Sequence, residues 1–383
     1  MTARRCFLLL LASCGGGASS SPATTPPPAP VRPSAPVQAP VRPPDPPAAD
    51  ARAERIELTF MGDVMFGGTF SGRFVPQDVE AHDPLSEVDT FIASDLALAN
   101  LETTVASTIP IANMKSNLQF SATPAQVSLL PRHGMKTFTI ANNHVNDLDG
   151  AGVAETALHL KELGITFIGG YVLKPPAVRA ETIEVKGWKI AFIAATTKLN
   201  RPQKPGGPVL PMVELANLEA ELVPIIKDAR SSHDLVIVVL HWGVQYANAP
   251  LPEQVAAARA FIDAGARAVI GHHPHVLQAI ERYKDGLIAY SLGNFVFQNA
   301  VKEQRDTGVL RLGFSRDGKA CIDLAAFHPL QMRASPVHHP VPVKGADFSG
   351  IAKKLQRLST AAPFSTKWTV DGDRLTTTTG CPK

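Results

Sequence analysis

The sequence predicts an alternating α/β domain. Short apolar, β-branched runs of the kind found in buried strands recur between segments with helical periodicity. The strongest run covers residues 234–240, and its unbroken apolar character is typical of a central strand covered on both faces. Residues 252–264 place Ala258 and Phe261 on one helical face, and Gly265 ends that segment. Because apolar residues make up 45% of the 383-residue chain, there is enough hydrophobic side chain for a substantial core.

The first 14 residues have the composition of an export signal. Arg4 and Arg5 precede about eight apolar residues, which is far short of the ~20 needed to span a bilayer. The run from Leu11 to Cys14 resembles the bacterial lipobox, so we expect a signal peptide over residues 1–14 and a lipid on Cys14. The prediction is an exported membrane lipoprotein that faces the periplasm or the cell surface. Twin-arginine export and a cytosolic protein with an apolar N-terminus are the alternatives.

Residues 15–53 form a segment rich in Pro, Ala and Ser. Twelve prolines lie between Pro22 and Pro47, and the segment has too few apolar side chains to offset the entropy of ordering it. We expect an extended tether between the lipid and a folded domain. A ligand for a proline-binding domain is the alternative.

Charge and cysteine content narrow the function classes. Removal of the leader takes away two arginines and no acidic residue, so the net charge falls by two from +3. So small a net charge gives no reason to expect a nucleic-acid partner. Cys6 leaves with the leader, and Cys321 and Cys381 remain in an oxidising compartment, as either one disulfide or two free thiols.

The folded domain is expected over residues 54–345, followed by a C-terminal tail over 346–383 with a hairpin. Strands are predicted at 56–60, 136–140, 165–168, 182–185, 189–194, 234–240, 268–271, 287–295, 308–314 and 320–326. Helices are predicted from Pro124 onward and over 151–163, 213–229 and 252–264. The tail hairpin is predicted over 368–375. The apolar run before Asn100 reads as a strand or as the start of a helix.

Polar side chains follow five of these apolar runs where each run ends. They are Gly62-Asp63, Asn100-Leu101-Glu102, Asn142-Asn143-His144, His241-Trp242-Gly243 and Gly271-His272-His273-Pro274-His275. Carboxylate, amide and imidazole groups are the usual protein ligands of divalent transition metals. An ordinary turn, a surface charge, a core histidine or a His-rich loop explains each stretch singly. Together they predict a metal centre assembled from strand ends, in which His144 could donate a proton.

These stretches resemble the poly-γ-glutamate capsule-synthesis (CapA) family of the metallophosphoesterase superfamily. The matching stretches also include Asp147 and Tyr290-Ser-Leu-Gly-Asn-Phe295, in family order from about residue 56 to 335. The resemblance implies a four-layer α/β/β/α sandwich of two mixed sheets with two divalent metals, Mn, Fe or Zn, at the sheet ends. It implies the following ligands: Asp63, Glu102, Asn143, His241, His273 and His275. His144 would be the catalytic histidine, and His272, Asn142 and Asp147 are additional candidate ligands.

Three positions differ from the ligand pattern of many phosphoesterases or from that of the family. Met65 stands where many phosphoesterases have a histidine ligand, a loss that the resembled family shares. Gln245 stands where the family usually has glutamate, and Arg267 where aspartate is common. The expected function is a metal-dependent hydrolase of the cell envelope that takes part in the synthesis or export of a capsule-type polymer. Expected partners are the membrane, an anionic polymer and other capsule-synthesis proteins. The alternatives are a non-catalytic envelope protein that anchors or exports the polymer, and a metallophosphoesterase with an unrelated substrate.

Overall fold

We describe a computed structural model of the chain that covers residues 53–70, 73–109, 119–173, 176–298, 301–316, 320–379 and 381. All of them belong to one compact unit, Ala49–Lys383. The predicted signal peptide, the lipid on Cys14 and the tether before residue 53 lie outside the described residues. Among the helices that the structure describes, none combines the length and the apolar character needed to cross a membrane.

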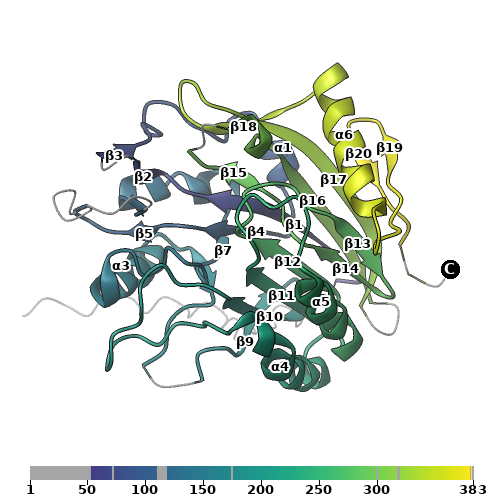
Figure 1. Cartoon of the computed structure of the whole chain (residues 1–383), viewed down its shortest axis with the longest axis horizontal. Helices are drawn as coiled ribbons and strands as arrows, with labels where there is room; N and C mark the ends of the chain where they lie inside the picture. The colour runs from purple at the N-terminus through teal and green to yellow at the C-terminus, as the bar shows by residue number, and fades with distance from the viewer. Residues whose placement is uncertain are drawn as a thin grey trace, which may run out of the picture. The chain divides into compact units, whose positions relative to one another are not determined.

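The larger sheet is a mixed sheet of ten strands (Figure 1). Its strand order is β19-β20-β17-β16-β1-β4-β7-β8, with β15 paired to β1 and β18 paired to β17. The strands are β1 (Arg55–Val64), β4 (Leu96–Leu101), β7 (Thr137–Thr139), β8 (Thr166–Ile168), β15 (Asn294–Val296), β16 (Asp306–Ser315), β17 (Cys321–Arg333), β18 (His339–Pro342), β19 (Thr369–Asp371) and β20 (Arg374–Thr376). Strands β1, β4, β7 and β8 run parallel, so their carboxyl ends lie at one edge.

The smaller sheet has six strands in the order β13-β14-β12-β11-β10-β9. The strands are β9 (Ala180–Val185), β10 (Trp188–Thr196), β11 (Leu235–His241), β12 (Ala268–His272), β13 (Ile280–Tyr283) and β14 (Gly286–Ala289). Strands β10, β11, β12 and β14 are parallel. Their register places Thr196 beside His241 and His241 beside His272, so three polar side chains end three adjacent strands.

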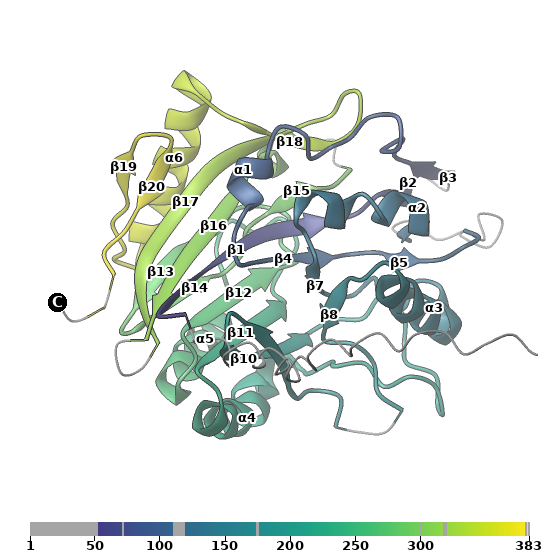
Figure 2. The ribbon, with the colours of Figure 1, turned by 180° about the vertical axis from the view of Figure 1, so that it is seen from behind.

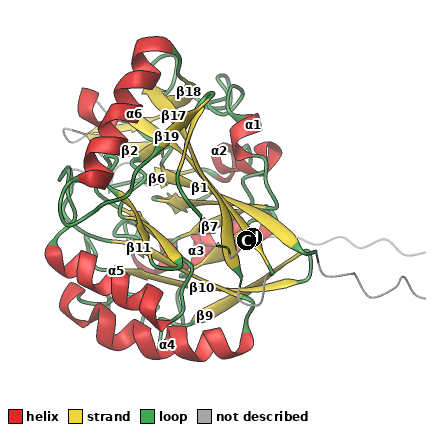
Figure 3. Cartoon of the chain, turned by 90° about the vertical axis from the view of Figure 1, so that its right-hand side faces the viewer, coloured by secondary structure: helices red, strands yellow, loops and turns green. Residues whose placement is uncertain are grey.

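All described helices except α6 (Gly345–Thr360) pack on the outer faces of the sheets, and two small ribbons lie beside the larger one (Figures 2 and 3). The helices are α1 (Asp89–Ile92), α2 (Pro124–Val127), α3 (Asp149–Glu162), α4 (Leu218–Ser232), α5 (Pro252–Ala264) and α6 (Gly345–Thr360). Single 3₁₀ turns lie at Leu130–His133, Leu215–Asn217 and Lys302–Gln304. The ribbons pair β2 (Gly67–Phe70) with β3 (Arg73–Pro76) and β5 (Thr104–Val105) with β6 (Ser121–Ala122).

The hydrophobic core follows from the alternation of side chains along the strands. Phe60 of β1 and Phe192 of β10 belong to one cluster, which therefore lies between the two sheets and also receives Leu355 of α6. A second cluster packs the opposite face of β1 and β4 against α3. A third packs the opposite face of β10 and β11 against α4 and α5. The prediction of an α/β domain built on two mixed sheets is confirmed.

Several element boundaries differ from the prediction. Helix α4 begins at Leu218, after a 3₁₀ turn, instead of at Val213. The stretch 287–295 is divided between β14 in the smaller sheet and β15 in the larger one, so the chain passes from sheet to sheet there. Helix α6 was not predicted at all.

The C-terminal segment is joined to the larger sheet. The hairpin β19–β20 pairs with β17 through Ala326 and Phe327. Of the two alternatives for the cysteines, the structure has the disulfide between Cys321 and Cys381. The last described residue is thus covalently tied to the start of β17.

Candidate metal centre

The five polar stretches meet where the carboxyl ends of the two sheets face each other. Asp63 lies near the end of β1 and Glu102 directly follows β4 in the larger sheet. His241 ends β11, and the turn with His273 and His275 follows β12 in the smaller sheet. All five side chains are buried. Parallel strands deliver their C-terminal residues to one edge, which explains how stretches so far apart in sequence converge.

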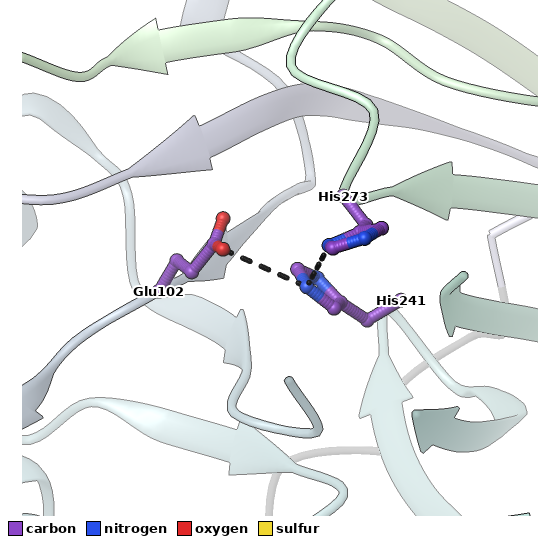
Figure 4. A group of neighbouring side chains, drawn as sticks. All are labelled: Glu102, His241 and His273. Atoms are coloured by element: carbon purple, nitrogen blue, oxygen red, sulfur yellow. Dashed lines mark hydrogen bonds and ion pairs between the residues drawn. The ribbon is translucent and has the colours of Figure 1, made fainter. Parts of the chain in front are cut away.

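Two groups of three side chains have the spacing of metal ligands. One group is Glu102, His241 and His273, and the other is Asp63, Glu102 and His275, with ligand atoms within 4.8 Å of one another in each. Figure 4 shows the first group: Glu102 Oε1 lies 3.6 Å from His241 Nε2, which lies 3.1 Å from His273 Nδ1. Glu102 belongs to both groups, so a carboxylate stands between two candidate metal positions.

The buried polar atoms of these groups fit a cation. Asp63 Oδ2, Glu102 Oε1 and His273 Nε2 lack a hydrogen-bond partner although they are inaccessible to solvent. His275 Nδ1 lies 3.1 Å from Asp63 Oδ2, but without the geometry of a hydrogen bond. Buried polar groups are almost always satisfied, and each exception requires an explanation. Carboxylate oxygens and imidazole nitrogens that converge in this way are the donor set of a divalent transition metal.

Electrostatics supports this reading. Burial raises the pKa of Glu102 well above its usual range, and the charge of Asp63 raises it further. Burial also acts to raise the pKa of Asp63, but its contacts with His272 and His275 outweigh burial and hold that pKa well below the usual range. A divalent cation would allow both carboxylates to stay ionised side by side.

The histidines of the first group are held neutral by their surroundings. Burial lowers the pKa of His241 well below its usual range, and the neighbouring His273 adds to the effect. Burial also lowers the pKa of His273 to about 3, with a further contribution from His275. Neutral imidazole is the form that binds metal.

Asn100 connects the two sheets at the centre. Its Nδ2 lies 2.9 Å from Asp63 Oδ1, 3.4 Å from Glu102 Oε2 and 3.2 Å from His241 Nδ1. Asn142 Nδ2 in turn donates to Asn100 Oδ1 at 3.1 Å. One amide of β4 thus contacts three candidate ligands.

The backbone of the histidine turn is strained. His273 has a φ of 99° and His275 a φ of 57°, which is unusual for residues other than glycine. Strain of this kind concentrates at functional sites. Gly271 lets the turn begin, because a Cβ there would lie 2.0 Å from the carbonyl oxygen of Tyr290. The turn is therefore held in shape by its surroundings and not by its own preferences.

A close approach of backbones positions Asp63. A Cβ at Gly62 would lie 2.0 Å from the carbonyl oxygen of Gly293, so only glycine fits there. This approach allows the Asp63 N–H to donate to Gly293 O at 3.0 Å and brings Asp63 beside Asn294. Asn294 Oδ1 then lies 3.0 Å from His275 Nδ1.

His144 lies beside the two groups and outside them. Its Nδ1 lies 2.7 Å from Asp147 Oδ2, and its Nε2 lies 3.8 Å from Glu102 Oε1. The ring stacks on Phe120, with 3.8 Å between the centroids. Asp147 is further fixed by the N–H of Phe120, which donates to its Oδ2 at 2.6 Å. The geometry is that of an imidazole oriented by a carboxylate for proton transfer.

The remaining predicted residues have the following places. Asn143 Oδ1 lies 2.7 Å from His241 Nε2, so its oxygen faces the first group. His272 is completely buried, with Nδ1 3.2 Å from Asp63 Oδ1, but it belongs to neither group. Asn142 bonds Asn100 and the carbonyl of Leu101, and Asp147 bonds His144, as already described. The two groups contain His273 and His275, two of the three histidines of the Gly-His-His-Pro-His stretch.

The three positions that differ from these patterns contribute packing and polar contacts. Met65 is buried in a cluster with Phe120 and Phe297. Gln245 Nε2 donates to Tyr246 Oη at 3.0 Å, and Arg267 Nε donates to the carbonyl of Ala320 at 3.0 Å. None of the three belongs to either candidate ligand group.

Sequence reasoning assigned no role to three asparagines at the centre. Asn100 and Asn294 stand inside stretches that were singled out, so strand position could have revealed them. Asn200 has no such signal, because it lies in a loop rich in Pro and Gly. It reaches the centre only through tertiary contacts: Asn143 Nδ2 donates to Asn200 Oδ1 at 3.0 Å.

Comparison with known proteins identifies the family of this chain. The pattern of the family described as "Bacterial capsule synthesis protein PGA_cap" matches residues 57–299. The capsule biosynthesis protein CapA of Bacillus anthracis is 30% identical over 305 residues, covering 76% of this chain and 72% of that protein. The PGA biosynthesis protein CapA of Bacillus subtilis (strain 168) is 29% identical over 331 residues, covering 84% and 82%.

A solved structure, the calcineurin-like phosphoesterase YfkN of Bacillus subtilis, is similar with a TM-score of 0.36 and 11% identity, covering 79% of this chain and 97% of that one. So distant a match adds nothing to the family assignment, which the sequence matches carry. The chain belongs to the bacterial capsule synthesis protein PGA_cap family.

Proposed function

We propose that this protein is a metal-dependent hydrolase of the cell envelope that acts in the synthesis or export of an anionic, capsule-type polymer. The observation that carries the proposal is Glu102, which is shared by two groups of candidate ligands. A carboxylate shared by two groups of ligands suits a centre for two divalent metals. The printed names of the relatives, which concern capsule and PGA biosynthesis, support the choice of polymer.

The first metal position would be held by Glu102, His241 and His273, with the oxygen of Asn143 beside them. The second would be held by Asp63, Glu102 and His275. A divalent cation bound there supplies Lewis-acid activation of water and of a carbonyl or phosphoryl oxygen. Mn, Fe and Zn all suit this mixture of carboxylate and imidazole donors.

The chain's own contribution to the reaction is His144. Asp147 accepts from Nδ1 and fixes the ring, which leaves Nε2 on the side of Glu102. From there Nε2 can give a proton to a leaving group or stabilise the developing negative charge. Phe120 covers the face of the ring and shields it from water. The same arrangement serves hydrolysis of a phosphoester or of an amide, so the site indicates the type of reaction and not the substrate.

The test is a metal and turnover analysis of the purified chain. We expect about two equivalents of divalent metal, and turnover of a generic phosphodiester or of poly-γ-glutamate. His144→Ala should keep the metal and lower kcat by roughly 10²- to 10⁴-fold, whereas His241→Ala should lose metal. Loss of metal in His144→Ala with full metal in His241→Ala would invert the assigned roles. A wild-type chain that cannot be loaded with Mn, Fe or Zn would refute the hydrolase.

A second candidate function is a non-catalytic role in anchoring or exporting the polymer. It is favoured by Met65, which fills with apolar packing a position where many phosphoesterases have a ligand. Under this alternative the chain binds the polymer without consuming it. Binding of poly-γ-glutamate with unchanged polymer length, in a chain that is fully loaded with metal, would decide for it.

We also propose that a lipid on Cys14 holds the protein on the membrane and that the polymer and other capsule-synthesis proteins are its partners. The lipobox-like run from Leu11 to Cys14 supports the lipid. Three acyl chains, at ~0.8 kcal/mol per buried methylene, would give stable attachment. Cell fractionation should find the wild type with membranes and Cys14→Ala released. Equal release of both would show that no lipid is attached.

A further inference from the structure

We propose that Asn200 is a positioning residue that sets the orientation of both Asn143 and His144. It lies on the loop after β10, is exposed, and touches two buried residues of the candidate centre. The inference rests on the proposed function, because it concerns a metal ligand and a proton donor of that same centre.

Asn200 orients the amide of Asn143. An asparagine ligates metal through its carbonyl oxygen, so the amide must present Oδ1 to the centre and Nδ2 away from it. In the structure, Oδ1 lies 2.7 Å from His241 Nε2 and Nδ2 donates to Asn200 Oδ1 at 3.0 Å. An acceptor on the outer side therefore selects the amide orientation in which the oxygen faces the ligands. Asn200 supplies that acceptor.

Asn200 also contacts the imidazole of His144. Asn200 Nδ2 lies 3.2 Å from His144 Nε2, while Asp147 Oδ2 lies 2.7 Å from Nδ1. Asn200 Nδ2 is also 3.3 Å from Nδ1, so the amide nitrogen lies almost equally close to both ring nitrogens. The ring is thus held by Asp147, by Asn200 and by the face of Phe120. One carboxamide links the candidate ligand to the candidate proton donor.

Asn200 is itself held firmly by the surrounding loop. Its backbone N–H donates to the carbonyl of Asn143 at 3.2 Å. Two residues earlier, the carbonyl of Lys198 accepts from Thr196 Oγ1 at 2.8 Å, and Thr196 is paired with His241 in the sheet. The intervening Leu199 packs on the outer cluster of the larger sheet. An exposed side chain with this support can act as a fixed partner, as outer partners of metal ligands do.

The test measures metal affinity, so that it does not depend on turnover. In the purified full-length chain, Asn200→Ala should weaken Mn²⁺ binding by roughly 10-fold or more, the usual cost of losing an outer partner. Asn200→Asp keeps an acceptor for Asn143 and should stay within about 3-fold of wild type. With a phosphodiester substrate, Asn200→Asp should lower kcat with little change in KM, because it replaces the amide nitrogen that contacts the His144 ring. Asn217→Ala, at an exposed asparagine without a capping bond, is the matched control and should change neither.

The outcomes separate the two proposals. If the wild type binds Mn²⁺ and Asn200→Ala binds it as tightly, the inference is wrong and the proposed function stands. If Asn200→Ala and Asn200→Asp lose metal equally, the acceptor argument is also wrong. If the wild type binds no metal, the proposed function fails and the positioning role falls with it.

Discussion

Histidines meet carboxylates in two regions of this molecule, with opposite surroundings. At the surface, His133 Nδ1 lies 2.6 Å from Asp89 and Nε2 lies 2.8 Å from Asp83, so both ring nitrogens have partners. The two aspartate side chains are 55% and 46% exposed. At the strand ends, the side chains of Asp63 and Glu102 are completely buried, and each keeps an oxygen without a hydrogen-bond partner.

This difference distinguishes a metal-ligand site from an ordinary pairing of histidine and carboxylate, even when no metal is bound. The surface histidine completes its hydrogen bonds with protein atoms, and solvent screens its charges, so nothing further is needed there. The buried centre combines desolvation with incomplete hydrogen bonding, which is costly unless another group is bound. The candidate metal centre is distinguished by buried polar atoms that lack hydrogen-bond partners. The mere proximity of histidine and carboxylate does not distinguish it.

The largest expected effect comes from Glu102, because both candidate groups use it. Glu102→Gln removes a charge and should weaken metal binding by more than the roughly 10- to 100-fold that follows loss of an outer partner. Metal titration with a competing chelator measures it. Asp83→Asn, the matched change at the surface histidine, should leave affinity unchanged. Equal effects of the two substitutions on metal affinity would show that the buried centre and the surface histidine do not differ in metal binding.

An intermediate effect is expected in the acid stability of the metal-free chain. His273 has a folded-state pKa of about 3, against 6.5 when unfolded. As the pH falls from 6.5 toward 3, His273 binds a proton in the unfolded state but not in the folded state, so the free energy of unfolding falls. At ~1.36 kcal/mol per pKa unit this amounts to a few kcal/mol. Urea unfolding at several pH values should show a shallower pH dependence in His273→Ala. If His133→Ala flattens it as much, burial is not the cause.

The smallest effect is expected at the surface pair. Asp83→Asn and Asp89→Asn should each change the free energy of unfolding by less than about 1 kcal/mol, because both aspartates are screened by solvent. Thermal unfolding in 0.1 M and 1 M salt measures this. A loss of several kcal/mol would mean that the ion pairs of the surface histidine contribute strongly to stability. That result would contradict the contrast between the surface histidine and the buried centre.

Strand-end chemistry was predictable from the sequence because it depends on local patterns. An apolar run predicts where β11 ends, and the polar residue that follows must then lie at the sheet edge, as His241 does. Helix α5 was predicted with its bounds because Pro252 and Gly265 mark both ends. In these cases the residues near each position are sufficient to decide the structure.

The rest depends on tertiary contacts that no local pattern contains. Helix α6 begins with a glycine and includes Gly350, both weak helix formers, and it buries Ile351 and Leu355 against the core between the sheets. Its stability comes from that packing. Asn200 meets Asn143 across 57 residues of chain, so its role follows from the loop's path alone. The amide of Asn100 likewise gains its function from partners on other strands.

The shared position of Glu102 has a consequence for the resistance of the folded domain to unfolding and proteolysis. Glu102 follows a strand of one sheet, while His241 and His273 belong to the other, so an ion held by all three acts as a cross-brace between the sheets. Free metal at 100 times its dissociation constant would add about 2.7 kcal/mol of resistance to unfolding. Metal supply would then govern not only whether the protein works but how long it survives proteases.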